Sequence, residues 1–185
     1  MMGRYGADPK QAERVVSTAQ HLFDGVATKL NLNSDDSDLL RRAAYLHEIG
    51  LAISHSGYHK HSAYFLQHSD IAGFSQMDQN YLSHLVAHHR RKLRSDARID
   101  ALRVGGNKLV YLWLLLRLAV LLNHSRSDEM LPAIELQAVN EQQWQLSVSG
   151  DAKQWPLLIA DLHDEQVQFK HWDIELSIHS EQFIN

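Results

Sequence analysis

The feature that most constrains the fold is an apolar segment, LVYLWLLLRLAVLL at residues 109–122, in which Arg117 is the only charged residue. It is shorter than the roughly 20 residues that a helix needs to cross a bilayer. We therefore predict a buried helix over residues 107–123. A charge in such a helix must find a carboxylate, a carbonyl group or a bound anion. For Arg117 we favour a structural ion pair over phosphate binding.

Capping residues and the helical spacing of apolar residues predict four helices before this segment. Asp8 and Pro9 are typical of a helix start, and Ser75 and Asp78 form a predicted capping box. The second helix is expected to end at Gly50, with His47 and Glu48 in its last turn. The predicted ranges are 9–30, 39–50, 60–67 and 76–89, and Gly105-Gly106 is the predicted hinge or opening turn of the fifth helix.

The composition changes from residue 131 onwards. IELQAVN and QWQLSVS alternate apolar and polar residues around residues 140–142, which predicts a β-hairpin. A helix is expected over 151–163, and one or two strands within 167–179. The chain is therefore predicted to be mainly α, with a helical domain over 1–126 followed by a small α+β domain over 127–185.

Charge is divided unevenly between these parts. Residues 1–126 carry 16 Lys and Arg against 11 Asp and Glu, whereas residues 127–185 carry 2 against 11. An anionic ligand would therefore prefer the first part. The chain has no cysteine, so a metal ion would need His, Asp or Glu. The N-terminus does not resemble a signal peptide, so we expect a location in the cytoplasm, either free or peripheral to a membrane.

Histidines are concentrated in residues 43–93, which hold eight of the 13 in the chain. Histidine ligates metals or carries a proton near neutral pH, and arginine matches phosphate oxygens bidentately. The segment runs into a basic cluster, HHRRKLR at 88–94, and residues 52–68 contain no Asp or Glu. We predict that this region either hydrolyses a phosphate or holds one.

Each of these clusters also has a purely structural interpretation. His47 and Glu48 either ligate a metal or form a hydrogen-bond network, and we favour the network. The basic run at 88–94 is equally typical of a solvated helix end. The sequence has no Gly-rich phosphate loop and no recognisable catalytic triad, which disfavours hydrolysis of nucleoside triphosphates by this chain. Further ligands for a metal would come from His59, His61, His84, His88 or His89.

Four segments, AAYLHEIGL, SHSGYHKHSAYFLQHSDIAGFS, LVAHHRRKL and LLRLAVLLNHSR, occur in this order. Together they closely resemble the C-terminal half of bacterial exopolyphosphatases, in the exopolyphosphatase/guanosine pentaphosphate phosphohydrolase family. The resemblance covers nearly the whole chain and is densest over 8–126. The loop HSG-x-H-x-HSAY is more similar to the exopolyphosphatase branch than to the guanosine pentaphosphate branch.

This resemblance implies an HD-like helical domain, similar to HD-type metallophosphohydrolases, and a small α+β domain. It also implies that the phosphatase site lies in N-terminal actin-like domains outside this sequence, where a divalent metal such as Mg²⁺ would act. We therefore expect a C-terminal fragment without a cofactor of its own. The positions that hold metal in HD hydrolases correspond here to Gln11, His47, Glu48 and Val120, so neither a metal site nor a catalytic residue is predicted.

The leading hypothesis is a fragment of an exopolyphosphatase that binds inorganic polyphosphate and supports homodimerisation. Its expected contacts are His55, His59, Lys60, His61, His88, His89, Arg90, Arg91, Lys92 and Arg94. If the histidines act as imidazolium, binding should weaken as the pH rises through about 6 to 8. The alternatives are the guanosine pentaphosphate branch, a degenerate HD-type hydrolase that retains one metal, and a non-catalytic domain whose acidic tail docks on a partner.

Overall fold

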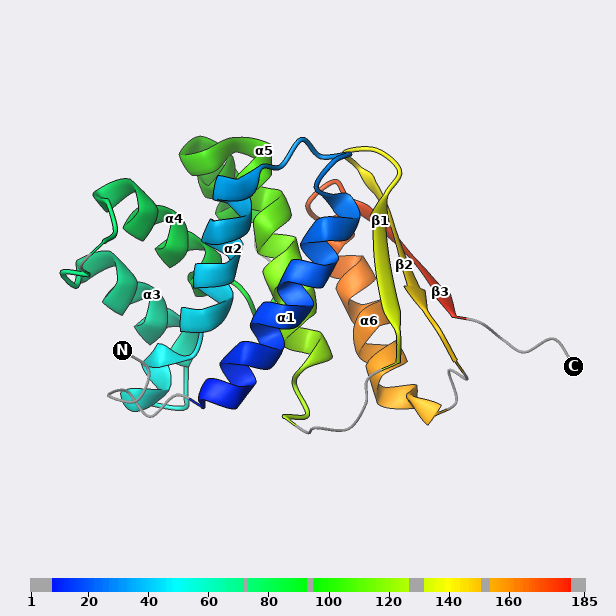
Figure 1. Cartoon of the computed structure of the whole chain (residues 1–185), viewed down its shortest axis with the longest axis horizontal. Coiled ribbons are helices and arrows are strands. Elements are labelled where there is room, and N and C mark those ends of the chain that lie inside the picture. The colour runs from blue at the N-terminus through cyan, green and yellow to red at the C-terminus, as the bar shows by residue number, and fades with distance from the viewer. Residues whose placement is uncertain (1–7, 72, 93–94, 127–131, 151–153, 181–185) are drawn as a thin grey trace, which may run out of the picture.

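The computed structural model describes residues 8–71, 73–92, 95–126, 132–150 and 154–180. In Figure 1, helix α5 lies in the middle of the molecule, with α2, α3 and α4 on its left and α6 with a three-stranded sheet on its right. Helix α1 crosses in front of α5 and reaches β1. The prediction of a mainly helical chain with a small α+β part is confirmed. The elements are α1 (Pro9–Val26), α2 (Ser34–Leu46), η2 (Ile49–Ala52), α3 (Tyr58–His68), α4 (Gln76–Ala87), α5 (Ser95–Leu122), β1 (Ile134–Ala138), β2 (Gln143–Val148), α6 (Pro156–Lys170) and β3 (Glu175–Ser180).

Local capping signals fix the starts of α1 and α4, as predicted. The Asp8 side chain accepts a hydrogen bond from the Lys10 backbone N–H at 3.0 Å, and Pro9 occupies the first turn of α1. Ser75 and Asp78 form the expected capping box at the start of α4. These contacts satisfy N–H groups that have no partner within the helix.

Helix α5 is the core of the fold. Its residues from Leu109 to Ala119 are all buried, so the prediction of a buried helix is confirmed. By length and composition α5 could cross a membrane, but 61% of its most apolar window is buried inside the protein, as in a core helix. Gly106 has φ 64° and ψ −161°, which interrupts the helix at the predicted opening turn. The helical segment from Ser95 to Gly105 was not predicted.

The end of α2 differs from the prediction. The helix stops at Leu46, so His47 and Glu48 lie in the turn before η2 and not in the last helical turn. The Ser62 hydroxyl of α3 donates to the His47 carbonyl at 2.9 Å and accepts from the Gly50 N–H at 2.8 Å. A Cβ atom on Gly50 would lie 2.2 Å from the Tyr58 carbonyl oxygen. Residues 47–50 therefore form hydrogen bonds to α3, which packs closely on them, and do not continue α2 by another turn.

The strands form a sheet in the order β1-β2-β3, with β1 and β2 antiparallel as the hairpin prediction requires, and β2 and β3 parallel. Helix α6 connects the parallel pair. It was expected over 151–163 but extends from Pro156 to Lys170, so residues 167–170 are helical and not a strand. Buried Phe169 contacts Trp144 of β2 at 6.0 Å between ring centroids, which shows why this last turn stays packed as helix.

The helical and β-containing parts share one hydrophobic core. Trp113 of α5 lies 4.3 Å from Trp172, measured between ring centroids. Gly25 of α1 packs so closely on β1 that an added Cβ would lie 2.0 Å from the Leu136 carbonyl oxygen. The division into domains at residues 126 and 127 stays a prediction, and residues 127–131 lie outside the described part of the chain.

Candidate functional site

A groove of about 820 Å³ lies between α3, α4 and the segment that follows α4. We call it the basic groove. Among the described residues that line it there is no Asp or Glu. It gathers six of the residues predicted from sequence to bind phosphate: His59, Lys60, His88, Arg90, Arg91 and Lys92.

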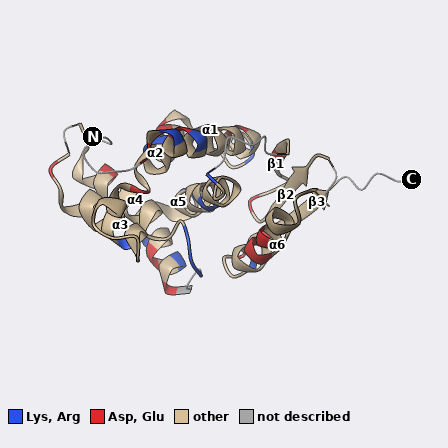
Figure 2. Cartoon of the chain, turned by 90° about the horizontal axis from the view of Figure 1, so that it is seen from below, with Lys and Arg blue, Asp and Glu red and all other residues tan. Residues whose placement is uncertain are grey.

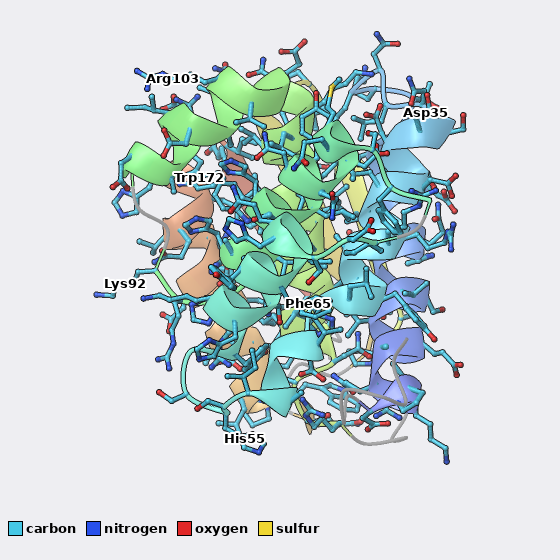
Figure 3. The ribbon with its side chains drawn as sticks, turned by 90° about the vertical axis from the view of Figure 1, so that its left-hand side faces the viewer. Asp35, His55, Phe65, Lys92, Arg103 and Trp172 are labelled. Atoms are coloured by element: carbon cyan, nitrogen blue, oxygen red, sulfur yellow. The ribbon has the colours of Figure 1, made fainter. Side chains whose placement is uncertain are left out.

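The other predicted residues lie elsewhere. His55 is exposed before α3, and His61 is half-buried on α3, but neither lines the basic groove. His89 is buried and faces a neighbouring cavity. Arg94 lies outside the described residues. In Figure 3, Lys92 projects outward at the side of the face formed by α3 and α4, whereas His55 lies at its lower end.

Backbone geometry brings the lining segments together. Gly57, with φ 70°, starts α3 without a side-chain cap, which places His59 and Lys60 in its first turn. On the other side, Arg117 Nη1 donates to the carbonyl oxygens of His88 at 3.0 Å and Arg91 at 2.8 Å. Arg117 therefore holds the basic segment after α4 in place from inside the fold.

Arg117 itself is not a phosphate ligand in this arrangement. It is 4% exposed, and its guanidinium binds both carboxylate oxygens of Glu165 on α6, with Nε 3.1 Å from Oε2. The favoured prediction, a structural ion pair, is confirmed. Figure 2 shows acidic residues along α6, and these include Asp161, Asp164 and Glu165.

A second cavity, of about 360 Å³, lies beside the basic groove and shares Arg90 and Arg91 with it. We call it the inner cavity. The guanidinium carbon of Arg90 lies 4.7 Å from the centre of the Tyr58 ring, where the two cavities meet. The inner cavity is lined by Gln11, Glu48, Tyr58, His89, Arg90, Arg91, Arg117, Val120, Leu121, His124, Arg126 and Glu165.

Of the four positions predicted to correspond to the metal ligands of HD hydrolases, three line the inner cavity and the fourth, His47, lies next to Glu48 in the sequence. Gln11, Glu48 and Val120 line the cavity, and His47 Nε2 lies 3.8 Å from Glu48 Oε1. Glu48 is bound by the Arg126 guanidinium, whose positive charge occupies the place next to the carboxylate. Val120 offers no donor atom. These residues do not fit a metal ion, and none of the described residues forms a group of three or more His, Asp or Glu placed to hold one.

Most polar atoms of this set have protein partners, but His47 Nε2 and Glu48 Oε2 are buried without a hydrogen-bond partner among the described residues. Gln11 Nε2 donates to the Asn123 carbonyl at 2.7 Å, and Arg14 donates to Gln11 Oε1 at 2.9 Å. His47 Nδ1 donates to the Ala44 carbonyl at 2.6 Å. His47 and Glu48 thus make separate hydrogen bonds, to the Ala44 carbonyl and to Arg126, and their interpretation as one hydrogen-bond network stays a prediction. Burial raises the pKa of Glu48, and the positive charge of the adjacent Arg126 guanidinium acts in the opposite direction.

Burial keeps several of the predicted histidines neutral. It lowers the pKa of His47, His59 and His88 to about 4, and the pKa of His89 well below its usual value. For His59 the positive charges of Arg90 and Lys60 act in the same direction. The expected imidazolium contribution to binding at pH 6 to 8 is therefore wrong for His59, His88 and His89. Near neutral pH the positive charge of the groove comes from lysine and arginine.

A family model described as Ppx/GppA phosphatase, domain III, matches residues 1–166. The chain belongs to the Ppx/GppA phosphatase family. The match to domain III agrees with the resemblance found in the sequence. This chain therefore corresponds to the C-terminal region of proteins in the family.

The relatives in this family are longer proteins. A protein of Pseudoalteromonas translucida named guanosine-5'-triphosphate,3'-diphosphate pyrophosphatase is 35% identical over 167 residues, which cover 89% of this chain and 33% of the relative. One of the same name from Vibrio cholerae is 38% identical over 149 residues, or 80% of this chain and 29% of the relative. This Ppx/GppA chain therefore spans about a third of the length of these relatives.

Sequence reasoning missed Tyr58 and Arg126, and it named His84 only as a possible metal ligand. Tyr58 and Arg126 line the inner cavity, and His84 lines the basic groove. Arg126 ends the segment LLNHSR that carries the family resemblance, but its partner Glu48 lies 78 positions earlier. Such a pair leaves no signal in the local pattern. Tyr58 stands between the histidines of the HSGYHKH loop and was not singled out.

Proposed function

We propose that this domain holds inorganic polyphosphate for a phosphohydrolase of the Ppx/GppA family and does not cut it. The observation that carries the proposal is the basic groove, which collects lysine, arginine and histidine side chains from three segments with no lining carboxylate among the described residues. Charge-assisted hydrogen bonds to phosphate oxygens are shorter and stronger than neutral ones. Such a groove suits a linear chain of phosphates.

The flexible charged side chains of the basic groove support binding that does not depend on which phosphate unit of the chain lies at which contact. A polyphosphate chain repeats the same anionic group, so a shift by one unit replaces each contact with an equivalent one. Lys60 and Lys92 are exposed at the groove, and lysine binds phosphate as a point charge on a flexible stem. Many contacts of this kind hold a chain while allowing it to slide.

Affinity for long-chain polyphosphate, measured across a salt series with phosphate release followed in the same samples, tests the proposal. The expected result is binding that weakens steeply with salt, by analogy with nucleic-acid backbones, and no release of phosphate. In the double variant Lys60→Glu/Lys92→Glu, the slope of log affinity against log salt should become shallower by about one for each phosphate that a lysine no longer neutralises.

The matched control is the double variant Lys10→Glu/Lys29→Glu, which makes the same charge change at exposed positions of α1 and the turn after it. The control should keep the slope of the unaltered chain apart from a small general effect of net charge. Equal losses of affinity in both double variants would contradict a localised groove. Metal-dependent phosphate release by the chain alone would instead favour a degenerate HD-type hydrolase.

The rest of the proposal concerns the longer protein. Actin-like domains on the N-terminal side, which the family resemblance implies, would release the terminal orthophosphate with a divalent metal such as Mg²⁺. A homodimer would let the basic groove of one copy continue on the other. Sedimentation equilibrium of the chain tests the dimer, and binding to separately produced actin-like domains tests the contact between the two parts.

Guanosine pentaphosphate is the second candidate ligand, because the relatives from Pseudoalteromonas translucida and Vibrio cholerae carry the name of its pyrophosphatase. It is also rich in phosphate, so the same groove would attract it. Competition between the two ligands separates the candidates. Displacement of polyphosphate by stoichiometric guanosine pentaphosphate would favour the nucleotide, whereas displacement only at a large excess would favour polyphosphate.

A further inference from the structure

The inner cavity combines excess positive charge with one buried acceptor. Arg90 and Arg91 have no ion-pair partner among the described residues, although both line this cavity. Its two carboxylates are already paired, Glu165 with Arg117 and Glu48 with Arg126. The cavity therefore carries net positive charge at neutral pH and favours an anion.

The acceptor is the second carboxylate oxygen of Glu48. Its Oε1 is bound by Arg126, whereas Oε2 is buried and has no hydrogen-bond partner in the described part of the protein. The Glu48 residue is only 5% exposed. A buried carboxylate oxygen without a donor is costly, so the site is suited to a ligand that brings a donor of its own.

A ligand for this site must therefore satisfy two demands at once. It needs several anionic oxygens for the guanidinium groups and one hydroxyl for Glu48. A fully deprotonated oxyanion such as sulfate offers only acceptor oxygens. It cannot donate a hydrogen bond to the Glu48 carboxylate, and the two sets of oxygen lone pairs would repel each other. A phosphoryl group that retains one P–OH supplies both, because the hydroxyl donates to Glu48 while the remaining oxygens accept from arginine.

We propose that the inner cavity binds a protonated phosphoryl group, with Glu48 Oε2 accepting its P–OH and Arg90, Arg91 and Arg126 facing its other oxygens. At about 360 Å³ the cavity has room for such a tetrahedral group together with several waters. Two sources share this chemistry: free orthophosphate and the end group of a phosphate chain. The proposal does not require that the basic groove binds polyphosphate.

Comparison of orthophosphate with sulfate tests the role of Glu48. At mildly alkaline pH both are tetrahedral dianions, and only hydrogen phosphate carries a hydroxyl. Isothermal titration calorimetry of the unaltered chain should give an affinity for phosphate about tenfold or more above that for sulfate. In Glu48→Gln, whose amide can donate to sulfate, this preference should disappear. The matched control is Glu135→Gln on the exposed face of β1, which should keep it.

Equal affinities for phosphate and sulfate in the unaltered chain would overturn the proposal, as would a preference that survives Glu48→Gln. If Glu48→Gln does not fold, Val120→Phe provides the second test. Val120 lies on the cavity wall and is not fully buried, so the larger ring fills the cavity without entering the core. Phosphate binding should then be lost, and unchanged binding would contradict the assigned place.

Three phosphate compounds at neutral pH distinguish the two sources. Linear tripolyphosphate has end groups that carry a P–OH, whereas cyclic trimetaphosphate has none. If tripolyphosphate displaces orthophosphate from the unaltered chain but not from Glu48→Gln, the cavity binds the ends of phosphate chains. If only orthophosphate binds, the cavity is a site for the free ion. Trimetaphosphate binding as tight as either would overturn the requirement for a hydroxyl. The double variant Lys60→Glu/Lys92→Glu should still bind orthophosphate. The proposal for the basic groove and the proposal for the inner cavity can therefore be contradicted separately.

Discussion

Arg117 of α5 binds both carboxylate oxygens of Glu165 on α6 while it also donates to two backbone carbonyls of the segment after α4. Both partners of the pair are largely buried, with side chains 3% and 13% exposed. The pair therefore joins the helical part, the β-containing part and the wall of the basic groove. Removal of Arg117 should affect both stability and the geometry of the groove.

The variant Arg117→Met should lower the free energy of unfolding by about 3 to 5 kcal/mol, since it leaves a buried carboxylate without its partner. Urea unfolding monitored by tryptophan fluorescence measures this loss. The control is Arg41→Met, because Arg41 pairs with Asp38 on the surface and both side chains are more than half exposed. It should cost no more than about 0.5 kcal/mol. Similar losses of stability in the two variants would contradict the role given to Arg117.

Gly50 is expected to tolerate no side chain. A Cβ at this position would lie 2.2 Å from the Tyr58 carbonyl oxygen and 2.5 Å from the Ser62 nitrogen, so two backbone segments would have to separate. Gly50→Ala should cost about 2 kcal/mol or more in the same unfolding measurement. Gly57→Ala serves as the control, because φ is +70° there but nothing lies within 4 Å of the added carbon. It should cost only about 1 kcal/mol, and a larger cost than for Gly50→Ala would contradict the close approach at Gly50.

How much of the fold could be predicted depends on the sequence distance of the deciding contact. Asp8 and Ser75 cap helices within three residues, so the starts of α1 and α4 were correct. The end of α2 was wrong because Ser62, which bonds to His47 and Gly50, lies on another helix. A local pattern contains no information about such a partner.

The candidate site shows the same limit. The residue types of the basic groove were visible as two acid-free clusters, and the structure brings six predicted residues together. Their protonation was not visible, because the burial that lowers the pKa of His59 and His88 results from tertiary packing, as where the His88 ring lies 4.6 Å from that of Trp113 on α5. The inner cavity was missed as a binding place, since Arg126 and Glu48 lie 78 positions apart in the sequence.

Stability should fall as the solution becomes more acidic. The folded-state pKa of His47 is about 4, below the ordinary value of 6.5, so between these values the unfolded chain binds more protons than the folded chain. The stabilisation is complete above pH 6.5 and is lost as the pH falls towards about 4. His47 alone should contribute a loss of about 3 kcal/mol. Urea unfolding at a series of pH values measures the slope, and His47→Gln should make it shallower by about 1.4 kcal/mol per pH unit. A slope that is the same in this variant would contradict the prediction.

Polyphosphate binding should take up protons at acidic pH. The positive charges of Arg90, Lys60 and Arg91 contribute to the lowered pKa of His59, and a polyanion in the basic groove would neutralise them. The pKa of His59 should therefore be higher in the complex than in the free chain, so affinity should rise as the pH falls below about 6 and change little between pH 7 and 8. The gain is at most about tenfold for each unit by which the pKa rises.

Calorimetry in two buffers with different ionisation enthalpies counts the protons exchanged on binding. With long-chain polyphosphate, whose interior groups stay ionised, uptake should be measurable at mildly acidic pH and absent at pH 8. His59→Gln should reduce the uptake at acidic pH and leave binding at pH 8 nearly unchanged, because His59 is neutral there and the lysine and arginine contacts remain. Proton release at acidic pH, or uptake that is unaffected by His59→Gln, would show that His59 does not lie in the field of the bound polyanion.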